Sequence, residues 1–327
     1  MRDSSVLAHH LQPLNDLMAA DDTTELVINR PGEVAVERSG RWIWHDVPKL
    51  TEAWLRTLAT AAAAWTGQDV SAEHPICSTT LPGEERVQIV LPPVASAGCP
   101  SLTIRKPSHA ALSLNDFSNG GVFDAVSPSG AQSLVADQLA RLHELGDWIA
   151  FFDLAVKSRC NILVSGATGS GKTTFAKGLI QQIPLDERLL TIEDTREFIV
   201  PHRNVVHMIY AKDGQGQARV GPKALLESAL RMRPDRILLQ ELRDESAFFF
   251  LRNVASGHPG SITTIHADSA ALAFDNLALL IRESSAGREL PAEDVSRLLR
   301  RLIDVVVQMR KIDGRFRVTE VWFEPDR

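Results

Sequence analysis

The chain has 327 residues, of which 44% are hydrophobic and 23% charged, and its formal net charge is −6 at pH 7. A chain of this length exceeds the usual size of one hydrophobic core, so we expect two domains. The acidic balance argues against a surface built mainly to neutralise nucleic-acid phosphates, and no direct sequence-specific nucleic-acid binding is expected.

The cysteines and the N-terminus bear on cellular location. Cys77, Cys99 and Cys160 are far apart and form no CxxC pair, so neither a zinc site nor a disulfide framework is expected. The N-terminus carries acids and histidines where a signal peptide needs a long apolar stretch, and no segment has about 18 uninterrupted apolar residues. We therefore expect a cytoplasmic chain without a membrane span, which can still reach a membrane through a partner.

The first hundred residues predict an α+β unit. Three runs of alternating apolar residues between 26 and 44, separated by turn residues, predict an antiparallel meander. Apolar residues at helical spacing over 50–66, followed by Gly67, predict a helix that packs on this sheet. Two further strands are predicted over 86–91 and 101–105.

Residues 108–130 are rich in Ser, Asn, Gly and Pro and are interpreted as an interdomain linker. A helical stripe over 135–152 follows, and then strands and helices alternate to about residue 284. Such alternation predicts a parallel sheet covered by helices. The predicted strands span 161–165, 189–193, 205–210, 237–241 and 261–265. The predicted domains are 1–107 and 131–327.

Residues 166–173 read GATGSGKT and match the phosphate-loop template GxxxxGK[ST], between an apolar strand and a helix. Glycines let successive backbone amides turn inward around phosphates, and the following helix points its positive end at the same anion. We expect Lys172 to bridge the terminal phosphates of ATP and Thr173 to bind Mg²⁺. The predicted nucleotide-binding residues of this segment are Gly166, Ala167, Thr168, Gly169, Ser170, Gly171, Lys172, Thr173 and Thr174.

Hydrolysis of ATP also needs a carboxylate that holds Mg²⁺ or orients water. Glu193 and Glu241 each stand at the end of a predicted strand, and Glu241 ends an apolar run typical of a Walker B segment. Because the carboxyl ends of parallel strands meet at one edge of a sheet, both acids are expected beside the phosphate loop. Either acid could instead cap a helix or face solvent, and which one activates water stays open.

Two histidines flank the last predicted strand. His266 follows it, where the side chain could hydrogen-bond a γ-phosphate, and we include it among the candidate catalytic residues. His258 precedes it and could bridge a loop or contact nucleotide, although the Pro259-Gly260 turn breaks the strand register between the two histidines. A lone histidine is more often structural than functional.

Four blocks in series make the chain resemble the hexameric traffic ATPases of type IV secretion systems, within the wider secretion and pilus-motor superfamily. The blocks are GATGSGKT, TIEDTREF, ILLQELRD and SGHPGSITTIHA, and the N-terminal TELVINRPGEV, ERVQIVLPP and SLTIRKP look like that family's first domain. The resemblance covers essentially the whole chain. It implies an α/β fold with a RecA-like P-loop NTPase C-terminal domain and a smaller α+β N-terminal domain.

The resemblance also implies a homo-hexamer that binds ATP at the hinge between the two domains. Arg86 and Arg105 match arginines of the family's N-terminal domain that reach the nucleotide, and Arg243 is a further candidate for pairing within the ring. The implied activity is Mg-ATP hydrolysis that powers substrate transfer or pilus assembly. Partners would be cytoplasmic and inner-membrane components of the secretion system, so the chain would be peripheral to the inner membrane.

Three further features bear on the resemblance to the family. Gln240 stands before the Walker B acid where the family usually has a small residue, so packing near the phosphates is expected to differ. Loop 211–222 is interpreted as a surface loop, with a pore-lining role as the alternative. The tetracysteine zinc module of the type II relatives is absent from the sequence, which favours the type IV branch.

Three alternatives remain at this point. An assembly or retraction motor of type IV pili shares the same chemistry and has a different N-terminal domain. A nucleotide-gated docking scaffold would bind ATP with incidental turnover, but it need not keep Lys172, Thr173, Glu193 and Glu241. A helicase predicts basic or aromatic strand-binding features, and only 6% of the residues are aromatic. The cargo, whether DNA, effector protein or pilin, does not follow from the sequence.

Overall fold

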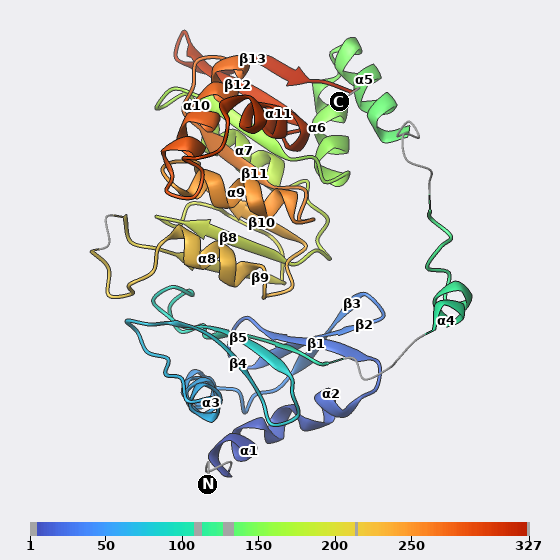
Figure 1. Ribbon diagram of the computed structural model, residues 1–327, viewed down its shortest axis with the longest axis vertical. Helices are drawn as coiled ribbons and strands as arrows, with labels where there is room; N and C mark the ends of the chain where they lie inside the picture. Colours follow the sequence, from blue (N-terminus) through green and yellow to red (C-terminus); the bar gives the residue numbers. More distant parts are fainter. Residues whose placement is uncertain (1–4, 108–112, 127–133, 213–214, 326–327) are drawn as a thin grey trace.

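The computed structural model describes residues 5–107, 113–126, 134–212 and 215–325. It has an N-terminal sheet domain and a C-terminal domain of sheet and helices, and the segment 113–126 stands to one side of both (Figure 1). Residues 108–112 and 127–130 of the predicted linker and residues 213–214 of loop 211–222 lie outside the described residues. Within the described residues, no helix has the length and apolar character needed to cross a membrane.

The N-terminal sheet has six antiparallel strands in the order β3-β2-β1-β6-β5-β4. The predicted meander, the two further strands and the helix over 50–66 are confirmed. That helix, α3, begins after Thr51, whose hydroxyl accepts a hydrogen bond from the backbone N–H of Trp54. The strands are β1 Thr23–Ile28, β2 Glu33–Arg38, β3 Arg41–Asp46, β4 Ile76–Thr80, β5 Arg86–Val90 and β6 Ser101–Arg105.

Three short helical segments at the start of the chain were not expected from the sequence, nor was β4. They are α1 Ser5–Leu11, η1 Gln12–Leu14 and α2 Asn15–Ala19. Each is too short for a helical period to show, and tertiary packing fixes them instead. Leu7 and Leu14 are buried in one apolar cluster with Leu26 of β1 and Leu55 of α3, Glu52–Trp65.

The C-terminal domain is built on two hydrogen-bonded groups of strands, β10-β8-β9 and β11-β7-β12-β13. The groups meet where Glu241 pairs with Thr264 and the N–H of Leu242 donates to the carbonyl of Thr264 at 2.8 Å. The strands therefore lie side by side in the order β9-β8-β10-β11-β7-β12-β13. They are β7 Ile162–Gly166, β8 Leu189–Glu193, β9 Val205–Ile209, β10 Arg236–Leu239, β11 Ile262–Ile265, β12 Val305–Ile312 and β13 Arg315–Phe323.

The predicted parallel arrangement is confirmed for β7 to β11; β12, which was not predicted, pairs parallel with β7, and β13 pairs antiparallel with β12 at the edge. The stripe predicted as one helix over 135–152 is two helices, because Gly146 has φ +70° and Asp147 caps the second helix. The helices from the linker onward are α4 Leu114–Asn119, α5 Leu134–Leu145, α6 Trp148–Lys157, α7 Lys172–Ile180, α8 Pro222–Ala229, α9 Ser246–Ala255, α10 Ala270–Glu283 and α11 Ala292–Leu302.

The alternation of strands and helices runs past residue 284, where the sequence prediction ended. It continues through α11 into the hairpin of β12 and β13. The hairpin turns at Asp313 and Gly314, both with positive φ, as a type I′ turn requires. The Asp-Gly pair between apolar strands was the signal for this hairpin in the sequence, and the pairing of β12 with β7 places the hairpin beside β7.

The face of the N-terminal sheet packs on the β8 and β9 side of the C-terminal domain. Fully buried Arg188 donates hydrogen bonds to the side chains of Asn29 at 2.7 Å and Thr103 at 3.3 Å, and to the carbonyl of Met232 at 2.9 Å. Burial lowers the pKa of Arg188 to about 9, so the guanidinium stays charged at neutral pH. Its hydrogen bonds satisfy that charge and join the two domains.

Candidate functional site

The predicted phosphate loop lies between a buried strand and a helix, as expected. All five residues of β7 are buried, and α7 begins at Lys172, directly after Gly171. Gly171 has φ +91°, and a Cβ there would lie 2.7 Å from the ring of Phe316. No other residue type meets both demands, since side chains disfavour this conformation and the ring leaves no room for one.

The loop offers unpaired donors, which is what a phosphate group requires. The backbone N–H groups of Gly169 and Gly171 donate to no atom in the described part of the chain. The hydroxyl of Ser170 is buried and likewise without a partner among those residues. A Cβ added at Gly169 would meet nothing within 4 Å, so open space lies in front of these groups. The residues present therefore fit an anionic phosphate at the start of α7.

Lys172 is 7% exposed and folds back over the loop. Its Nζ donates to the carbonyl oxygens of Gly166 at 2.8 Å and Ala167 at 3.0 Å, and it lies 3.4 Å from Nδ1 of His266. Burial lowers the pKa of the Lys172 ammonium, while the charge of Glu241 acts in the opposite direction. The ammonium is thus held at the phosphate loop and faces the acid that follows β10.

A chain of polar contacts connects Lys172 with the ends of three other strands. Nε2 of His266 lies 2.6 Å from one carboxylate oxygen of Glu241, and Arg243 donates to the other oxygen at 2.7 Å. Arg243 also lies 2.9 Å from Asp194, at the end of β8. With Nδ1 of His266 facing an ammonium donor and Nε2 facing a carboxylate, the neutral tautomer with its proton on Nε2 satisfies both contacts.

Glu193 is the other predicted catalytic acid, and its surroundings are different. In strand order, β10 and β11 separate β8 from β7, and the side chain is fully buried. The carboxylate accepts hydrogen bonds from the N–H groups of Glu197 and Phe198, both at 2.7 Å, and from the Thr191 hydroxyl at 2.8 Å. Burial alone raises the pKa of Glu193, but these bonds and the contact with His207 outweigh it and lower the pKa.

Gln240, the departure from the family's pattern, has a defined contact. Its side chain is buried, and its Oε1 accepts a hydrogen bond from the backbone N–H of Asp194 at 3.2 Å. The amide side chain therefore links the end of β10 to the end of β8. Asp194 in turn reaches Arg243 through its carboxylate.

The structure does not bring His258 to the phosphate loop of its own chain. His258 precedes β11, whereas His266 follows it, so the two histidines lie at opposite ends of that strand. The phosphate loop follows β7, which is parallel to β11, and therefore lies at the His266 end. Burial lowers the pKa of His258, and its Nδ1 has no partner within the described residues.

Arg86 and Arg105 also lie away from the phosphate loop of their own chain. They stand opposite each other on β5 and β6 and line two adjoining cavities of about 590 and 700 Å³. The other basic residues of these cavities are Arg231, Arg233 and Lys106, and no residue of the phosphate loop lines either one. Glu25 and Glu37 also line the second cavity and pair with Arg105 and Arg233, but the basic residues outnumber them, so this face suits an anionic partner.

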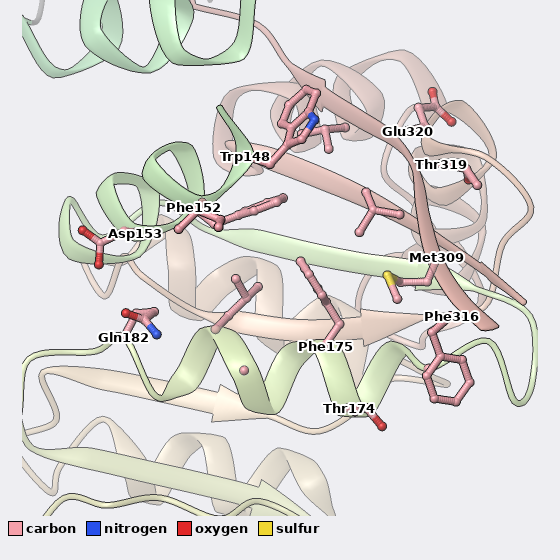
Figure 2. A pocket seen from close by; sticks show the side chains of 16 residues that line it. Trp148, Phe152, Asp153, Thr174, Phe175, Gln182, Met309, Phe316, Thr319 and Glu320 are labelled. Carbon is pink, nitrogen blue, oxygen red and sulfur yellow. The ribbon is translucent and has the colours of Figure 1, made fainter. Parts of the chain in front are cut away.

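A functional candidate that was not predicted from the sequence is Phe316, on β13. It lines a cavity of about 860 Å³ that begins at Gly171 and Thr174 and runs along α7 (Figure 2). The Asp313-Gly314 turn would have placed this aromatic residue in a hairpin. Its position beside the phosphate loop depends on the pairing of β12 with β7, which the sequence pattern does not specify.

Comparison with known proteins agrees with the four blocks and their geometry. The profile of the family described as "Type II/IV secretion system protein" matches residues 8–313. The chain is 46% identical to the type IV secretion system protein VirB11 of Bartonella henselae, over 98% of this chain and 94% of that protein. It is 44% identical to VirB11 of Brucella suis, over 97% of this chain and 90% of that one.

A solved structure supports the fold directly. The VirB11 ATPase of the Brucella suis type IV secretion system, in complex with sulphate, superposes with a TM-score of 0.92 and is 42% identical, covering 98% of both chains. Relatedness at this level spans the N-terminal sheet, the phosphate loop and the strand ends that carry Glu193 and Glu241. The chain therefore belongs to the Type II/IV secretion system protein family and is an ATPase of its type IV secretion branch.

Proposed function

We propose that the chain is a Mg-ATP-driven ring motor of a type IV secretion system, with Glu241 as the acid that acts on the hydrolytic water. The contact chain from Lys172 through His266 to Glu241 is the observation that carries this assignment. It places a carboxylate in contact with the histidine that faces the phosphate-loop lysine. Glu193 has its carboxylate committed to backbone N–H groups, which supports a positioning role for it.

Each phosphate-site residue has a role in this proposal. Residues 166–174 cradle the phosphates, Lys172 leaves the loop carbonyls for the terminal phosphates, and His266 donates to the same group. No group of three or more His, Cys, Asp or Glu side chains in the described residues can hold a metal ion alone. Mg²⁺ would therefore be held by the Thr173 hydroxyl and Glu241 together with ATP oxygens, and it would neutralise charge that develops on the phosphates.

We propose that the ring is a homo-hexamer in which Arg86 and Arg105 serve the nucleotide of a neighbouring copy. Both arginines line cavities without any residue of their own phosphate loop. A guanidinium suits the charge of a phosphate, and the Arg105 side chain is 68% exposed although Glu25 of β1 lies 3.8 Å from its Nε. Arg243, held by Asp194 and Glu241, transmits the state of the site within the chain. His258 is left with a role at a neighbouring copy or in loop structure.

Cytoplasmic and inner-membrane components of the secretion system are the proposed partners, which would make the protein peripheral to the inner membrane on its cytoplasmic side. The relatives named above are secretion-system proteins, which supports this placement. Movement of the two domains around ATP would be the mechanical output. The net charge of −6 fits a motor that docks on protein partners rather than one that tracks nucleic acid.

Phosphate release from Mg-ATP by the purified chain tests the enzyme directly, at several protein concentrations. We expect turnover per subunit to rise with concentration as the ring assembles, and to vanish in Lys172→Ala. The matched control is Lys177→Ala, which removes another lysine of α7 that is paired with Glu197. Equal loss in both variants, or wild-type ATP binding without turnover when assembled, would replace the motor with a docking scaffold.

Mixing two inactive variants tests the contribution of the neighbouring copy. If Arg105 acts on the next subunit, a mixture of Lys172→Ala and Arg105→Ala chains contains sites with both groups intact, and activity returns. If Arg105 acts within its own chain, every site in the mixture lacks one group and the mixture stays inactive. Mass measurement with and without Mg-ATP accompanies this experiment, and a strictly monomeric species at micromolar concentration contradicts the ring.

A further inference from the structure

Four charged side chains form a row across the N-terminal sheet. Glu37 of β2 stands opposite Glu25 of β1, which in turn stands opposite Arg105 of β6. Arg86 of β5 follows on the other side of Arg105. Residues directly opposite on neighbouring antiparallel strands share one face of the sheet, and all four line the cavity of about 700 Å³ described above. The acidic half of the row meets the basic half where Glu25 faces Arg105.

Glu37, at the acidic end of the row, has both carboxylate oxygens engaged. One oxygen accepts hydrogen bonds from Nε of Arg233 and from the Thr24 hydroxyl, each at 3.2 Å, and the other accepts from Nη2 of Arg233. Arg233 also donates to Asp235 at 2.9 Å, so its guanidinium is shared between two carboxylates. This end of the row is therefore fixed to the C-terminal domain.

The contact between Glu25 and Arg105 is looser. Nε of Arg105 lies 3.8 Å from a carboxylate oxygen of Glu25, which is beyond hydrogen-bond distance. The Arg105 side chain is 68% exposed, whereas that of Glu25 is 9% exposed. Arg105 can therefore turn toward a ligand in the cavity, while Glu25 stays within the sheet.

The charge on Glu25 depends on Arg105. Besides burial, the groups that act on the ionisation of Glu25 are Arg105, Glu37, Arg233 and Arg188. Arg233 and Arg188 are already hydrogen-bonded to other groups. When Arg105 turns away, a buried carboxylate is left beside the charge of Glu37, and both burial and the like charge favour its protonated form.

We propose that Glu25 is the resting partner of Arg105 and takes up a proton from solvent when Arg105 leaves it for the phosphates of ATP. The inference rests on the proposed function, in which Arg105 serves the nucleotide of a neighbouring copy. The proton adds to one carboxylate oxygen, and no other covalent bond forms or breaks. It enters from the cavity, which Glu25 itself lines. Glu25 is thus a positioning residue, which holds Arg105 when ionised and releases it when protonated.

This coupling operates near neutral pH. Burial raises the pKa of Glu25 to about 7 while Arg105 is still beside it, and Arg105 is the strongest of the charges that oppose the rise. The departure of Arg105 raises the pKa further, so protons are gained at and above neutral pH. Because linkage is reciprocal, ATP binding should weaken as pH rises through this range, and it should weaken less in Glu25→Gln.

Calorimetric titration of the assembled full chain tests the proposal, with Mg²⁺ and a non-hydrolysable ATP analogue in buffers of different ionisation enthalpy. The dependence of the observed heat on the buffer gives the number of protons taken up per nucleotide. At about pH 7.5 the wild type should take up about 0.3 to 0.5 proton more than Glu25→Gln, because Glu25 starts only partly protonated. Arg105→Ala should lose the same uptake, since no arginine then leaves the carboxylate, and its intact phosphate loop still binds the analogue.

Glu33→Gln is the matched control, because it removes another carboxylate of β2 that pairs with Arg203 and is absent from the lining of the cavity. Its proton uptake should equal that of the wild type. Equal uptake in the wild type and Glu25→Gln overturns the proposal, as does unchanged uptake in Arg105→Ala. When that result accompanies normal ATP turnover, the proposal about Glu25 fails alone. A wild type that does not bind the analogue contradicts the proposed function as well.

Discussion

Glu193 ends β8 and Glu241 follows the neighbouring strand β10, and the two acids look alike in the sequence. Their surroundings are opposite. Glu193 is fully buried and accepts hydrogen bonds from two backbone N–H groups and a hydroxyl. Glu241 is partly exposed and contacts the side chains of His266 and Arg243. A carboxylate fixed by backbone donors stabilises a loop, whereas one held by other side chains can exchange partners during a reaction.

The largest expected effect comes from Glu241→Gln, which keeps the shape of the side chain and removes its basicity. Turnover should fall about 10²- to 10⁴-fold, the usual contribution of a general base, while ATP affinity changes little. Single-turnover phosphate release together with ATP titration separates the two quantities. A Glu241→Gln enzyme that turns over within a few-fold of the wild type would reverse the roles assigned to the two acids.

Glu193→Gln should act mainly on stability. Its amide can no longer accept from every donor that surrounds it, and breaking a buried charged network costs about 3 to 5 kcal/mol. Because folding lowers the pKa of Glu193, its contribution is present above the unfolded-state pKa and is lost as pH falls through the folded-state pKa. Urea unfolding should therefore show the deficit at neutral pH and a smaller one in acid. Equal deficits at both pH values would contradict this account.

Glu25 extends the comparison between Glu193 and Glu241, because its carboxyl group is buried without hydrogen-bond donors among the described residues. Its side chain accepts no hydrogen bond within the described residues, and Nε of Arg105 is 3.8 Å away. Burial raises its pKa to about 7, against the opposing charges of Arg105, Arg233 and Arg188 and with the aid of Glu37.

The folded state therefore keeps a proton on Glu25 that the unfolded state loses near pH 4.5, so stability falls as pH rises from about 4.5 to about 7. The full change is on the order of 3 kcal/mol. Glu25→Gln should remove this fall, and it should gain stability over the wild type most clearly at pH 8. Urea unfolding between pH 5 and pH 8 measures both proteins. Parallel stability profiles of the two would contradict the raised pKa of Glu25.

The smallest expected effect is that of Gln240→Ala. It removes one acceptor from the N–H of Asp194 and should cost about 1 kcal/mol, the net value of an ordinary hydrogen bond. Turnover should drop only a few-fold, because the Glu241 contacts remain. Thermal unfolding and steady-state turnover report the two effects. A loss of activity as large as that of Glu241→Gln would contradict this account and assign Gln240 a direct role in catalysis.

Much of this architecture follows from periodicity and turn chemistry. The meander of β1 to β3, helix α3 and the strands of the parallel sheet each carry enough alternating or apolar residues to be recognised. The sequence also places both acids at strand ends. It does not reveal that β10 and β11 lie between Glu193 and the phosphate loop, because strand order depends on tertiary contacts far apart in the chain. The position of Phe316 escaped prediction for the same reason.

Arg188 has a consequence for motion. Its side chain is bonded to the N-terminal domain, and the next residue begins β8, the five-residue strand that ends at Glu193. A strand of this length extends about 16 Å and resists bending when hydrogen-bonded on both sides. In the motor proposed above, displacement of the N-terminal sheet would pull on the same strand whose far end adjoins Asp194, Arg243 and Glu241, so β8 would couple force to chemistry along its length.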